Sequence, residues 1–407
     1  MLAAQLVTTQ IVAFHFQRVY PWGLLANVPV LILSGWLTVA TLFTTVVGLL
    51  WAPAGMWLGG TVWLGLHALL AVVSFFADLP YSAIPFSRKD VPLLIGVLIG
   101  AVALTHTKRV GEVVRGLLRD RPGRVAVAAG CATCVLVWFW AWRPPGLLEV
   151  TFLDVGQGEA ALIRLPDARA LLIDGGHATP TFDYGERVVT PFLLSRRVRR
   201  LDWMVMTHPD SDHARGLPSV LRRLSVGHVY GLPSVPLDLN ADRNVRTAAL
   251  ARDVPMEYGA GAVLCDDVLD GRPLRIEVIY PRTRDDVELV DEYANNDSLV
   301  LLVTYGSVRM LFAGDIERDV EALLIERHTN GELDLRADVL KVPHHGSDSS
   351  SSPEFIEAVA PTAAIISVGE RNRYGHPAAE VMQRYIERGI RLYRTDGTRC
   401  WVRAVRR

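Results

Sequence analysis

Three apolar stretches without a single Asp, Glu, Lys or Arg limit most strongly how this chain can fold. They cover residues 24–50, 54–76 and 125–142 of the 407-residue sequence. A helix needs about 20 apolar residues to cross the hydrocarbon core of a bilayer, so the first two stretches are long enough and the third just reaches that length. A run at 91–105 is a shorter, weaker candidate. We therefore predict transmembrane helices in this part of the chain.

Composition changes near residue 146. Half of all residues are hydrophobic, and this excess lies before that point, whereas charged residues reach the density of a globular protein after it. We predict two parts, transmembrane helices at 1–146 and a soluble domain at 147–407. Residues 1–20 lack the basic start of a signal peptide, and His15 and Arg18 interrupt them, so we interpret them as an incomplete helix of the same bundle.

The loop at residues 106–124 predicts the orientation of the membrane part, because it holds six basic side chains and two acidic ones. By the positive-inside rule this loop is cytoplasmic, the helix at 125–142 runs outward, and the soluble domain lies outside the membrane. Arg88 and Lys89 would then also lie outside, which argues in the opposite direction.

Two global properties say little about partners or disulfides. The formal net charge of -1 gives no indication of a nucleic-acid or membrane-surface partner, although local clusters can differ from the average. Its 4 cysteines are too few and too scattered for a disulfide framework. The closest pair, Cys131 and Cys134, lies in an apolar run where helix packing explains it best.

Short apolar strands of the soluble domain end on polar residues. The runs ALLID, MVMTH, MLFAGD and LKVPHH end at Asp174, His208, Asp315 and His344–His345. Rigid strands deliver side chains from their ends into a shared site, so we expect these residues to meet. Strands and helices interleave without a strict βαβ repeat, which predicts a layered α/β fold with at least one mixed or antiparallel sheet. Helices are expected at 215–224, 316–328, 353–359 and 377–389.

The segment HPDSDH, residues 208–213, has the residue types of a metal site. The alternative is an Asx turn that caps a helix starting near Ala214. A cap uses one such residue, however, and leaves both histidines without a role. Because other candidate ligands stand at other strand ends, we interpret the histidines and aspartates of this segment as metal ligands. They are His208, Asp210, Asp212 and His213.

These motifs resemble those of the metallo-β-lactamase fold, a four-layer αββα sandwich with a metal pair at one edge. Within that superfamily, FLDVGQGEAALI, NNDSLVLLV, KVPHHGSDSSSS, IISVGERNRYGHP and YRTDGT resemble the C-terminal domain of ComEC-type competence proteins. That family takes up single-stranded DNA across bacterial membranes. The membrane part is similar to the last channel helices of the family, so the resemblance implies a C-terminal portion of such a protein.

The resemblance implies two divalent ions bridged by Asp315. The ligands would be His208, Asp210 and Asp315 for one ion, and Asp212, His213, Asp315 and His345 for the other. Two departures from the wider superfamily replace imidazole by oxygen. Asp210 stands in the place of a second histidine, and Asn295, Asn296 and Asp297 precede SLVLLV in place of a further histidine. Oxygen ligands suit harder ions, so Mn²⁺ is favoured, with Zn²⁺ or Mg²⁺ as alternatives.

Further polar residues are candidates for support or substrate contact. Asp174 is expected to orient a ligating histidine, although by itself it equally suits an ordinary turn. Asp154 is expected to orient its own loop, and Glu159 stands where the family usually has aspartate. Tyr374 could stack a base. The other candidates are Asn295, Asn296, Ser298, Ser347 and Arg373.

Basic residues could contact a DNA backbone, although such runs are more often solvated faces. They are Arg196, Arg197, Arg199 and Arg200 in SRRVRR, and Arg371 and Arg373 in ERNRYGH.

The resemblance and these residues together predict a metal-dependent nuclease that cuts DNA phosphodiesters during uptake and degrades the strand that is not imported. We expect it in the bacterial inner membrane, with its hydrolase domain on the extracytoplasmic side and other uptake components as partners. Asp212 or Asp210 would accept a proton, and His344 or His376 would polarise a phosphate oxygen or protonate the leaving oxygen; for His376 an ordinary loop histidine is an equal alternative. Two other functions stay open: a small-molecule hydrolase of the same fold, and a catalytically silent module that guides DNA into the channel.

Overall fold

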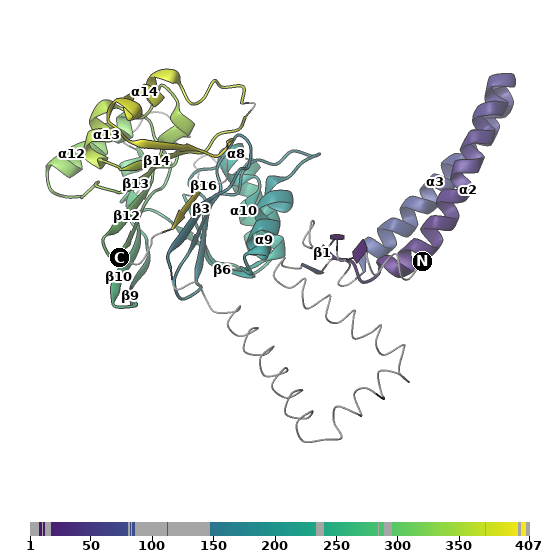
Figure 1. Cartoon of the computed structure of the whole chain (residues 1–407), viewed down its shortest axis with the longest axis horizontal. Helices are drawn as coiled ribbons and strands as arrows, with labels where there is room; N and C mark the ends of the chain where they lie inside the picture. The colour runs from purple at the N-terminus through teal and green to yellow at the C-terminus, as the bar shows by residue number, and fades with distance from the viewer. Residues whose placement is uncertain are drawn as a thin grey trace. The chain divides into compact units, whose positions relative to one another are not determined.

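The chain forms two compact units, one with two long helices and the other with two β-sheets (Figure 1). The structure is a computed structural model. It describes residues 8–9, 11–12, 18–79, 82, 84–85, 112, 147–232, 240–283, 285–288, 295–370, 372–397 and 400–403.

Two long apolar helices dominate the described part of the first unit, α2 (Gly23–Leu50) and α3 (Ala52–Asp78). Both are long and apolar enough to cross a membrane. They pack closely where α3 carries glycine, since a Cβ at Gly65 would lie 2.4 Å from the Trp36 ring. The structure thus confirms helices at the predicted 24–50 and 54–76, while their place in a membrane stays a prediction. The runs at 91–105 and 125–142 lie outside the described residues, as does the 106–124 loop apart from Glu112.

The prediction of a helix over residues 1–20 is wrong at its end. Arg18–Val19 forms a short strand, β1, which pairs antiparallel with β2 (Ile84–Pro85). Pro21 follows closely, and proline disfavours helical backbone at the residue before it. Residues 8–9 and 11–12 are helical, and beyond the strand the long helix α2 begins at Gly23.

Within the described part of the second unit, the first sheet has seven strands. In chain order they are β3 (Glu149–Phe152), β4 (Ala161–Arg164), β5 (Ala170–Ile173), β6 (Arg200–Val205), β7 (Ser225–Gly231), β8 (Met256–Tyr258) and β16 (Cys400–Arg403). Their spatial order is β16-β3-β4-β5-β6-β7-β8. Pairing is antiparallel from β16 to β5 and parallel from β5 to β8.

The second sheet also has seven described strands. They are β9 (Val263–Leu269), β10 (Arg272–Tyr280), β11 (Val300–Tyr305), β12 (Val308–Phe312), β13 (Val339–Lys341), β14 (Ala363–Ile366) and β15 (Arg391–Arg394). Their spatial order is β15-β14-β13-β12-β11-β10-β9, parallel from β15 to β12 and antiparallel beyond. Both sheets are therefore mixed, as predicted.

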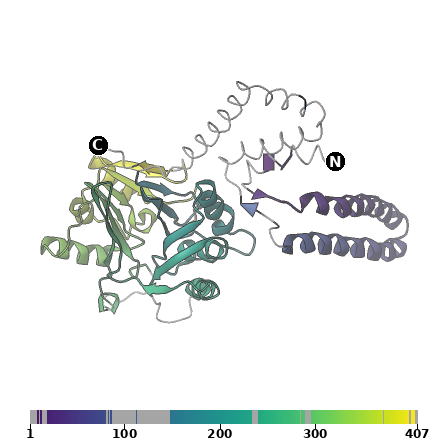
Figure 2. The same ribbon diagram turned by 90° about the horizontal axis from the view of Figure 1, so that it is seen from below.

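Helices cover the outer face of each sheet (Figure 2). Beside the first sheet lie η2 (Gly185–Val189), α7 (Thr190–Ser195), α8 (Ser211–Ala214), α9 (Leu217–Arg223) and α10 (Asn240–Leu250). The chain around the second sheet contains α11 (Asp285–Glu288), α12 (Arg318–Thr329), η3 (Pro343–Gly346), α13 (Pro353–Val359) and α14 (Ala379–Glu387). The four helices predicted from sequence correspond to α9, α12, α13 and α14, with ends shifted by a few residues at most.

Alternating side chains explain the four layers. In β5, Leu171 and Ile173 enter the core between the sheets, whereas Leu172 packs under the helices of the first sheet. In β12, Phe312 enters the central core and Leu311 packs under the opposite helices. Strands buried on both faces read as continuous apolar runs. The αββα sandwich expected from the resemblance is confirmed.

Candidate metal centre

The candidate ligands gather because parallel strands of both sheets end at one edge. Asp174 follows β5 and His208 follows β6 in the first sheet, while Asp315 follows β12 and His345 follows β13 in the second. The central core joins the two sheets, so four strand ends deliver polar side chains to one place. This is the convergence that the sequence predicted.

The side chain of Asp210 in the HPDSDH segment does not cap a helix. Asp210 occupies the N-cap position of the short helix α8, but its side chain makes no capping hydrogen bond. Its backbone carbonyl accepts from the amides of His213 and Ala214 instead. The carboxylates of Asp210 and Asp212 are thereby left for other partners.

Three imidazoles are each held at Nδ1. Nδ1 of His213 lies 2.8 Å from Oδ2 of Asp174, and Nδ1 of His345 lies 2.7 Å from the carbonyl oxygen of Ser367. Nδ1 of His208 lies 3.2 Å from Oγ of Ser298. A partner at one ring nitrogen fixes the orientation of the ring and leaves the other nitrogen to a metal.

The Nε2 atoms and nearby carboxylates have the spacing of ligands around one ion. Nε2 of His213 and Nε2 of His345 are 3.2 Å apart, and each lies 3.2 Å from Oδ2 of Asp315. Oδ2 of Asp212 lies 3.5 Å from Nε2 of His345. Donors held by an ion at about 2.0–2.1 Å in a tetrahedron lie about 3.3 Å apart. These four side chains therefore fit a divalent ion.

A second group contains His208. Nε2 of His208 is buried and has no hydrogen-bond partner among the described residues. Its ligand atom groups with those of His213 and Asp315 within 4.8 Å of one another. Asp210 lies further out, with Oδ2 3.8 Å from Nε2 of His208 and a side chain 38% exposed. An orphaned buried imidazole nitrogen is costly unless it binds something, so a second ion fits here, with Asp210 at its open side.

Charge separates these groups into neutral and ionised ligands. Burial and the neighbouring His213 lower the pKa of His208 to about 3. Burial opposes the charge of Asp315, but His213, His345 and Lys341 hold its pKa well below the usual range. Burial likewise opposes protonation of His213, yet Asp315 and Asp174 raise its pKa well above normal. The negative charge of the carboxylates thus holds a proton on His213. A bound metal cation would balance the same charge.

The two aspartates of the ligand loop differ. Burial and the charge of Asp212 raise the pKa of Asp210. Burial opposes the ionised form of Asp212 too, but contacts with His345 and His213 keep its pKa below the usual range. Of the two, Asp210 is therefore the better proton acceptor near neutral pH.

Behind the ligands, buried groups hold the loops. Asp174 accepts from the Thr207 amide at 2.9 Å and from its hydroxyl at 2.7 Å, besides contacting His213. Ser298 contacts His208 and accepts from the Asp315 amide at 2.9 Å. Asp174 thus ties the end of β5 to the segment after β6, and Ser298 connects the segments that follow β6 and β12. Ser298, from the NNDS motif, supports His208 without being a ligand itself.

The DVGQG loop packs against the ligand loop. Glu159 donates its amide to the Asp212 carbonyl at 3.1 Å. Gly158 has φ +137°, and a Cβ there would lie 2.2 Å from the Asp212 carbonyl oxygen, so only glycine fits. Asp154 is exposed, and its carboxylate accepts from the Gly156 amide at 3.1 Å. Its contact stays within its own loop, as expected.

Sequence reasoning missed Lys341, the last residue of β13. Its Nζ is buried, donates to the Gly314 carbonyl at 2.8 Å and to Oδ1 of Asp315 at 3.1 Å, and forms an ion pair with Glu159. Burial opposes its charge, but Glu159 and Asp315 raise its pKa above normal. A lone lysine inside the apolar run VLKVP was the one available signal.

A polar cluster beside the centre surrounds His344. Its Nδ1 lies 3.0 Å from Oε1 of Glu317, which also accepts from Nδ2 of Asn295 at 3.2 Å and from Oγ of Ser349 at 3.0 Å. Glu317, at the N-cap of α12, was also missed. The amide oxygen of Asn296 accepts from the Glu317 amide at 2.8 Å. Neither asparagine has a described contact with a candidate ligand, so both support this cluster.

Aromatic rings extend from His344 to the surface. The rings of His344 and His376 lie 5.6 Å apart, and Tyr374 stacks on His376 at 5.9 Å with an interplanar angle of 9°. Burial and both His344 and His345 lower the pKa of His376. Tyr374 is 72% exposed, and Arg373 is exposed beside it.

The remaining candidates differ in exposure. Ser347 is buried, and its hydroxyl lies 2.9 Å from that of Ser349. In SRRVRR, Arg199 and Arg200 are exposed. Arg371 is outside the described residues. Among the described residues, Ser347, Arg199 and Arg200 have no contact with a candidate metal ligand.

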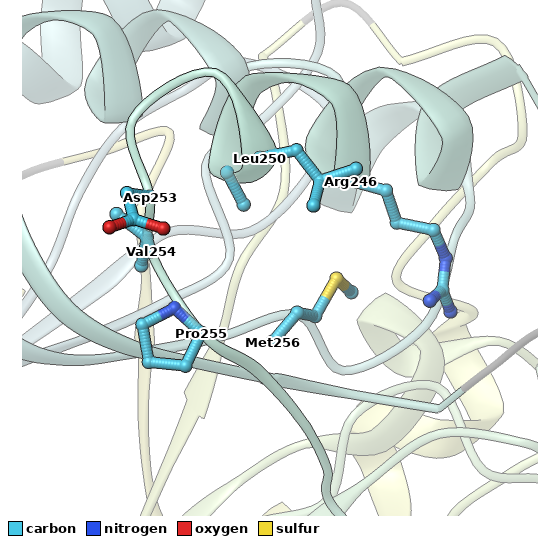
Figure 3. Close-up of a pocket in the computed structure, with 7 residues that line it drawn as sticks. Arg246, Leu250, Asp253, Val254, Pro255 and Met256 are labelled. Atoms are coloured by element: carbon cyan, nitrogen blue, oxygen red, sulfur yellow. The ribbon is translucent and has the colours of Figure 1, made fainter.

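A separate pocket of about 490 Å³ lies between the end of α10 and the start of β8 (Figure 3). Its lining is mainly apolar, with Arg246 and Asp253 as its charged residues. It contains none of the candidate ligands, so it carries no part of the metal chemistry.

Comparisons with known proteins assign a family to each part of the chain. The family model described as Metallo-beta-lactamase superfamily matches residues 153–370, just over half of the chain. The model described as Competence protein matches residues 1–110.

Two similar relatives are ComE operon protein 3 of Bacillus subtilis (strain 168) and Competence protein ComA of Neisseria gonorrhoeae. The first is 33% identical over 278 residues, covering 65% of this chain and 34% of the relative. The second is 31% identical over 312 residues, covering 75% and 37%. The chain thus spans about a third of the length of these relatives.

Proposed function

Since the chain belongs to the metallo-β-lactamase superfamily and joins that domain to a Competence protein segment as ComEC-type proteins do, we propose that it is a metal-dependent nuclease acting on DNA during uptake. The superfamily implies divalent metal binding. The observation that carries the proposal is the set of ligand atoms of His213, His345, Asp315 and Asp212 at the spacing of one coordination sphere, beside the orphaned Nε2 of His208.

The donor set favours a phosphodiester over a lactam. Asp210 replaces an imidazole at the open side of the centre, and the residues before β11 supply amides that support Glu317 in place of a further histidine. Carboxylate oxygens suit hard ions that bind phosphate oxygens. We therefore propose two divalent ions, Mn²⁺ in preference to Zn²⁺ or Mg²⁺.

When bound, two divalent ions polarise a phosphoryl group and lower the pKa of the attacking water. The protein's own groups then manage the protons. Asp210, partly exposed and with a raised pKa, takes the proton of the water, and the ionised Asp212 is the alternative acceptor.

For the leaving oxygen we propose His344 as the proton donor. Glu317 holds its Nδ1, which directs Nε2 away from that carboxylate and lets the ring pass a proton through it. His376 lies beside it and polarises a phosphate oxygen. These roles require substrate on the side of the centre where His344 and His376 meet.

The exposed rings suit a single strand. A nucleobase stacks on an aromatic face at about 1–3 kcal/mol per base, and Tyr374 offers such a face next to His376. Arg373, exposed beside Tyr374, supplies a sequence-independent contact to phosphates, whereas Arg199 and Arg200 precede or begin β6 at the end away from the centre. These contacts favour single-stranded DNA, and we propose the strand that is not imported as the substrate.

The two apolar helices and the Competence match indicate membrane association. We further propose a bacterial inner-membrane location, with residues 147–407 on the extracytoplasmic side and other uptake components as partners. The basic loop at 106–124 supports this orientation.

The test is a cleavage assay on the purified full chain with Mn²⁺ and either single- or double-stranded DNA. We expect cleavage that a chelator abolishes and that Asp212→Ala lowers about 100-fold or more. The matched control is Asp319→Ala, an exposed aspartate on α12, which should cut at the unmodified rate.

Two outcomes contradict the proposal. Absence of cleavage on every DNA, with unchanged DNA uptake in cells carrying Asp212→Ala, would make the domain a silent guide. Hydrolysis of a β-lactam without cleavage of DNA would make it a small-molecule hydrolase.

A further inference from the structure

Lys341 places a full positive charge in the protein interior next to the candidate metal centre. Its side chain is 0% exposed, and that of its partner Glu159 is 1% exposed. Desolvating two such charges costs several kcal/mol per ion unless their geometry and hydrogen bonds are good. Well-packed apolar side chains would fill the same volume at lower cost, so the pair calls for a specific role.

The contacts of Lys341 divide the two oxygens of Asp315. Oδ1 accepts from Nζ of Lys341 at 3.1 Å. Oδ2 lies 3.2 Å from Nε2 of both His213 and His345. Oδ1 is thus hydrogen-bonded to Lys341, and Oδ2 faces the two imidazoles.

Glu159 anchors the ammonium from the opposite sheet. It follows the DVGQG loop, and its backbone joins the ligand loop through the Asp212 carbonyl and the Asp174 turn through the Gly176 amide at 2.8 Å. Lys341 comes from β13, where the register of the second sheet fixes it beside β12 and Asp315. The ion pair therefore ties one ligand-bearing sheet to the other.

Glu159 is itself a candidate ligand. One of its oxygens groups with donor atoms of Asp174 and His213 within 4.8 Å of one another. Without Lys341, this buried carboxylate would be free to attract a cation away from the open edge of the site.

We propose that Lys341 and Glu159 are a positioning pair that reserves Oδ1 of Asp315 for the ammonium, so Asp315 binds metal through Oδ2 alone. If two ions share Asp315, Oδ2 would be the oxygen available to them, because Oδ1 is held by the ammonium. The pair also withholds Glu159 from coordination. This inference rests on the metal-binding part of the proposed function and not on the identity of the substrate.

The experiment replaces both charges together, in the full chain, by Glu159→Gln with Lys341→Met. Removing both avoids a lone buried charge, which destabilises more than the loss of the pair. The control is Asp286→Asn with Arg327→Met, another shielded ion pair, 2.6 Å between Nη2 and Oδ1, with no described contact to a candidate ligand. Mn²⁺ affinity is measured by calorimetry, the ion arrangement by electron paramagnetic resonance, and folding by thermal unfolding without metal.

For the Glu159/Lys341 variant we expect a cooperative unfolding transition, a 10-fold or greater loss of Mn²⁺ affinity, and loss of the spin coupling between the two ions, since supports behind ligands typically contribute 10–100-fold to affinity. The control pair should leave affinity and spectrum unchanged. A folded Glu159/Lys341 variant with unmodified affinity and spectrum would overturn the proposal.

If the double variant does not fold, the single variant Glu159→Gln tests the proposal. It keeps the ammonium on Asp315 but weakens its anchor, so we expect a several-fold loss of affinity, and unchanged affinity would overturn the proposal. Because the readouts are binding and spectra, the inference can hold for a chain that cuts no DNA, and it can fail for one that does.

Discussion

At the residue scale, the candidate metal centre depends on the groups that contact Nδ1 of each ligating imidazole. Asp174 is the most consequential of these supports, because it contacts His213 and both polar groups of Thr207 while fully buried. A carboxylate behind a ligating histidine fixes the tautomer and raises the basicity of the ring.

We expect Asp174→Asn to weaken Mn²⁺ binding by about 10–100-fold, because an amide of the same size presents an N–H where His213 needs an acceptor. Calorimetric titration of the purified protein measures this. Asp154→Asn, at an exposed residue that contacts only its own DVGQG loop, is the control and should change affinity less than two-fold. Equal losses in both variants would show that Asp174 has no special role.

The metal-free protein should lose stability as pH rises. Burial opposes the charge of His345, yet Asp315 and Asp212 raise its pKa to about 9 from the ordinary 6.5. A raised pKa stabilises the fold fully below pH 6.5, and this stabilisation disappears as pH approaches 9. At about 1.4 kcal/mol per pKa unit, the loss is on the order of 3 kcal/mol.

Denaturant unfolding of the chelator-treated protein at a series of pH values measures this loss. His345→Gln should reduce the dependence without abolishing it, because His213 also has a raised pKa, and bound Mn²⁺ should remove it because the metal replaces the protons. Stability that rises between pH 6.5 and 9 would contradict the assignment.

At the scale of elements, the site depends on how one loop packs on another. The DVGQG loop reaches Asp212 only because Gly158 has no side chain. We expect Gly158→Ala to lower the free energy of unfolding by about 2 kcal/mol or more and to weaken Mn²⁺ binding, since it combines an unfavourable φ with a clash.

Gly271→Ala is the control for Gly158. Gly271 also has positive φ, +72°, but a Cβ there meets nothing within 4 Å, so its cost should stay near 1 kcal/mol, without effect on metal affinity. Denaturant unfolding and calorimetry compare the two variants. Equal costs would mean that the contact with Asp212 is unimportant.

Much of this element-level structure could be predicted from sequence. Strands such as ALLID and MLFAGD show their apolar run and their polar end directly, so Asp174 and Asp315 could be placed at one edge before any coordinates. The side chains that contact these strand ends could not be predicted from the sequence. Glu159 and Lys341 meet from different sheets, and a lysine in VLKVP has no local pattern that names its acceptor. Glu317 reaches His344 in the same way, through tertiary packing.

For the whole molecule, the three clusters of buried hydrophobic side chains use residues from Leu148 to Tyr385 and none from α2 or α3. We therefore predict that residues 147–407 fold without the helices. Purified alone, this segment should unfold in one cooperative transition, and Mn²⁺ should raise its midpoint because a ligand that binds the folded state stabilises it. A broad transition that Mn²⁺ does not shift would contradict this prediction and indicate that residues outside 147–407 contribute to the core.

The central claim is a two-ion phosphodiesterase, and a titration of activity against bound metal tests it most directly. Mn²⁺ is added stepwise to metal-free full chain, and the cleavage rate of a single-stranded oligonucleotide is recorded at each measured ratio of metal to protein. The account predicts little cleavage up to one ion per chain and a rise that saturates at two. Full activity at one ion, or no cleavage at any loading, would contradict it.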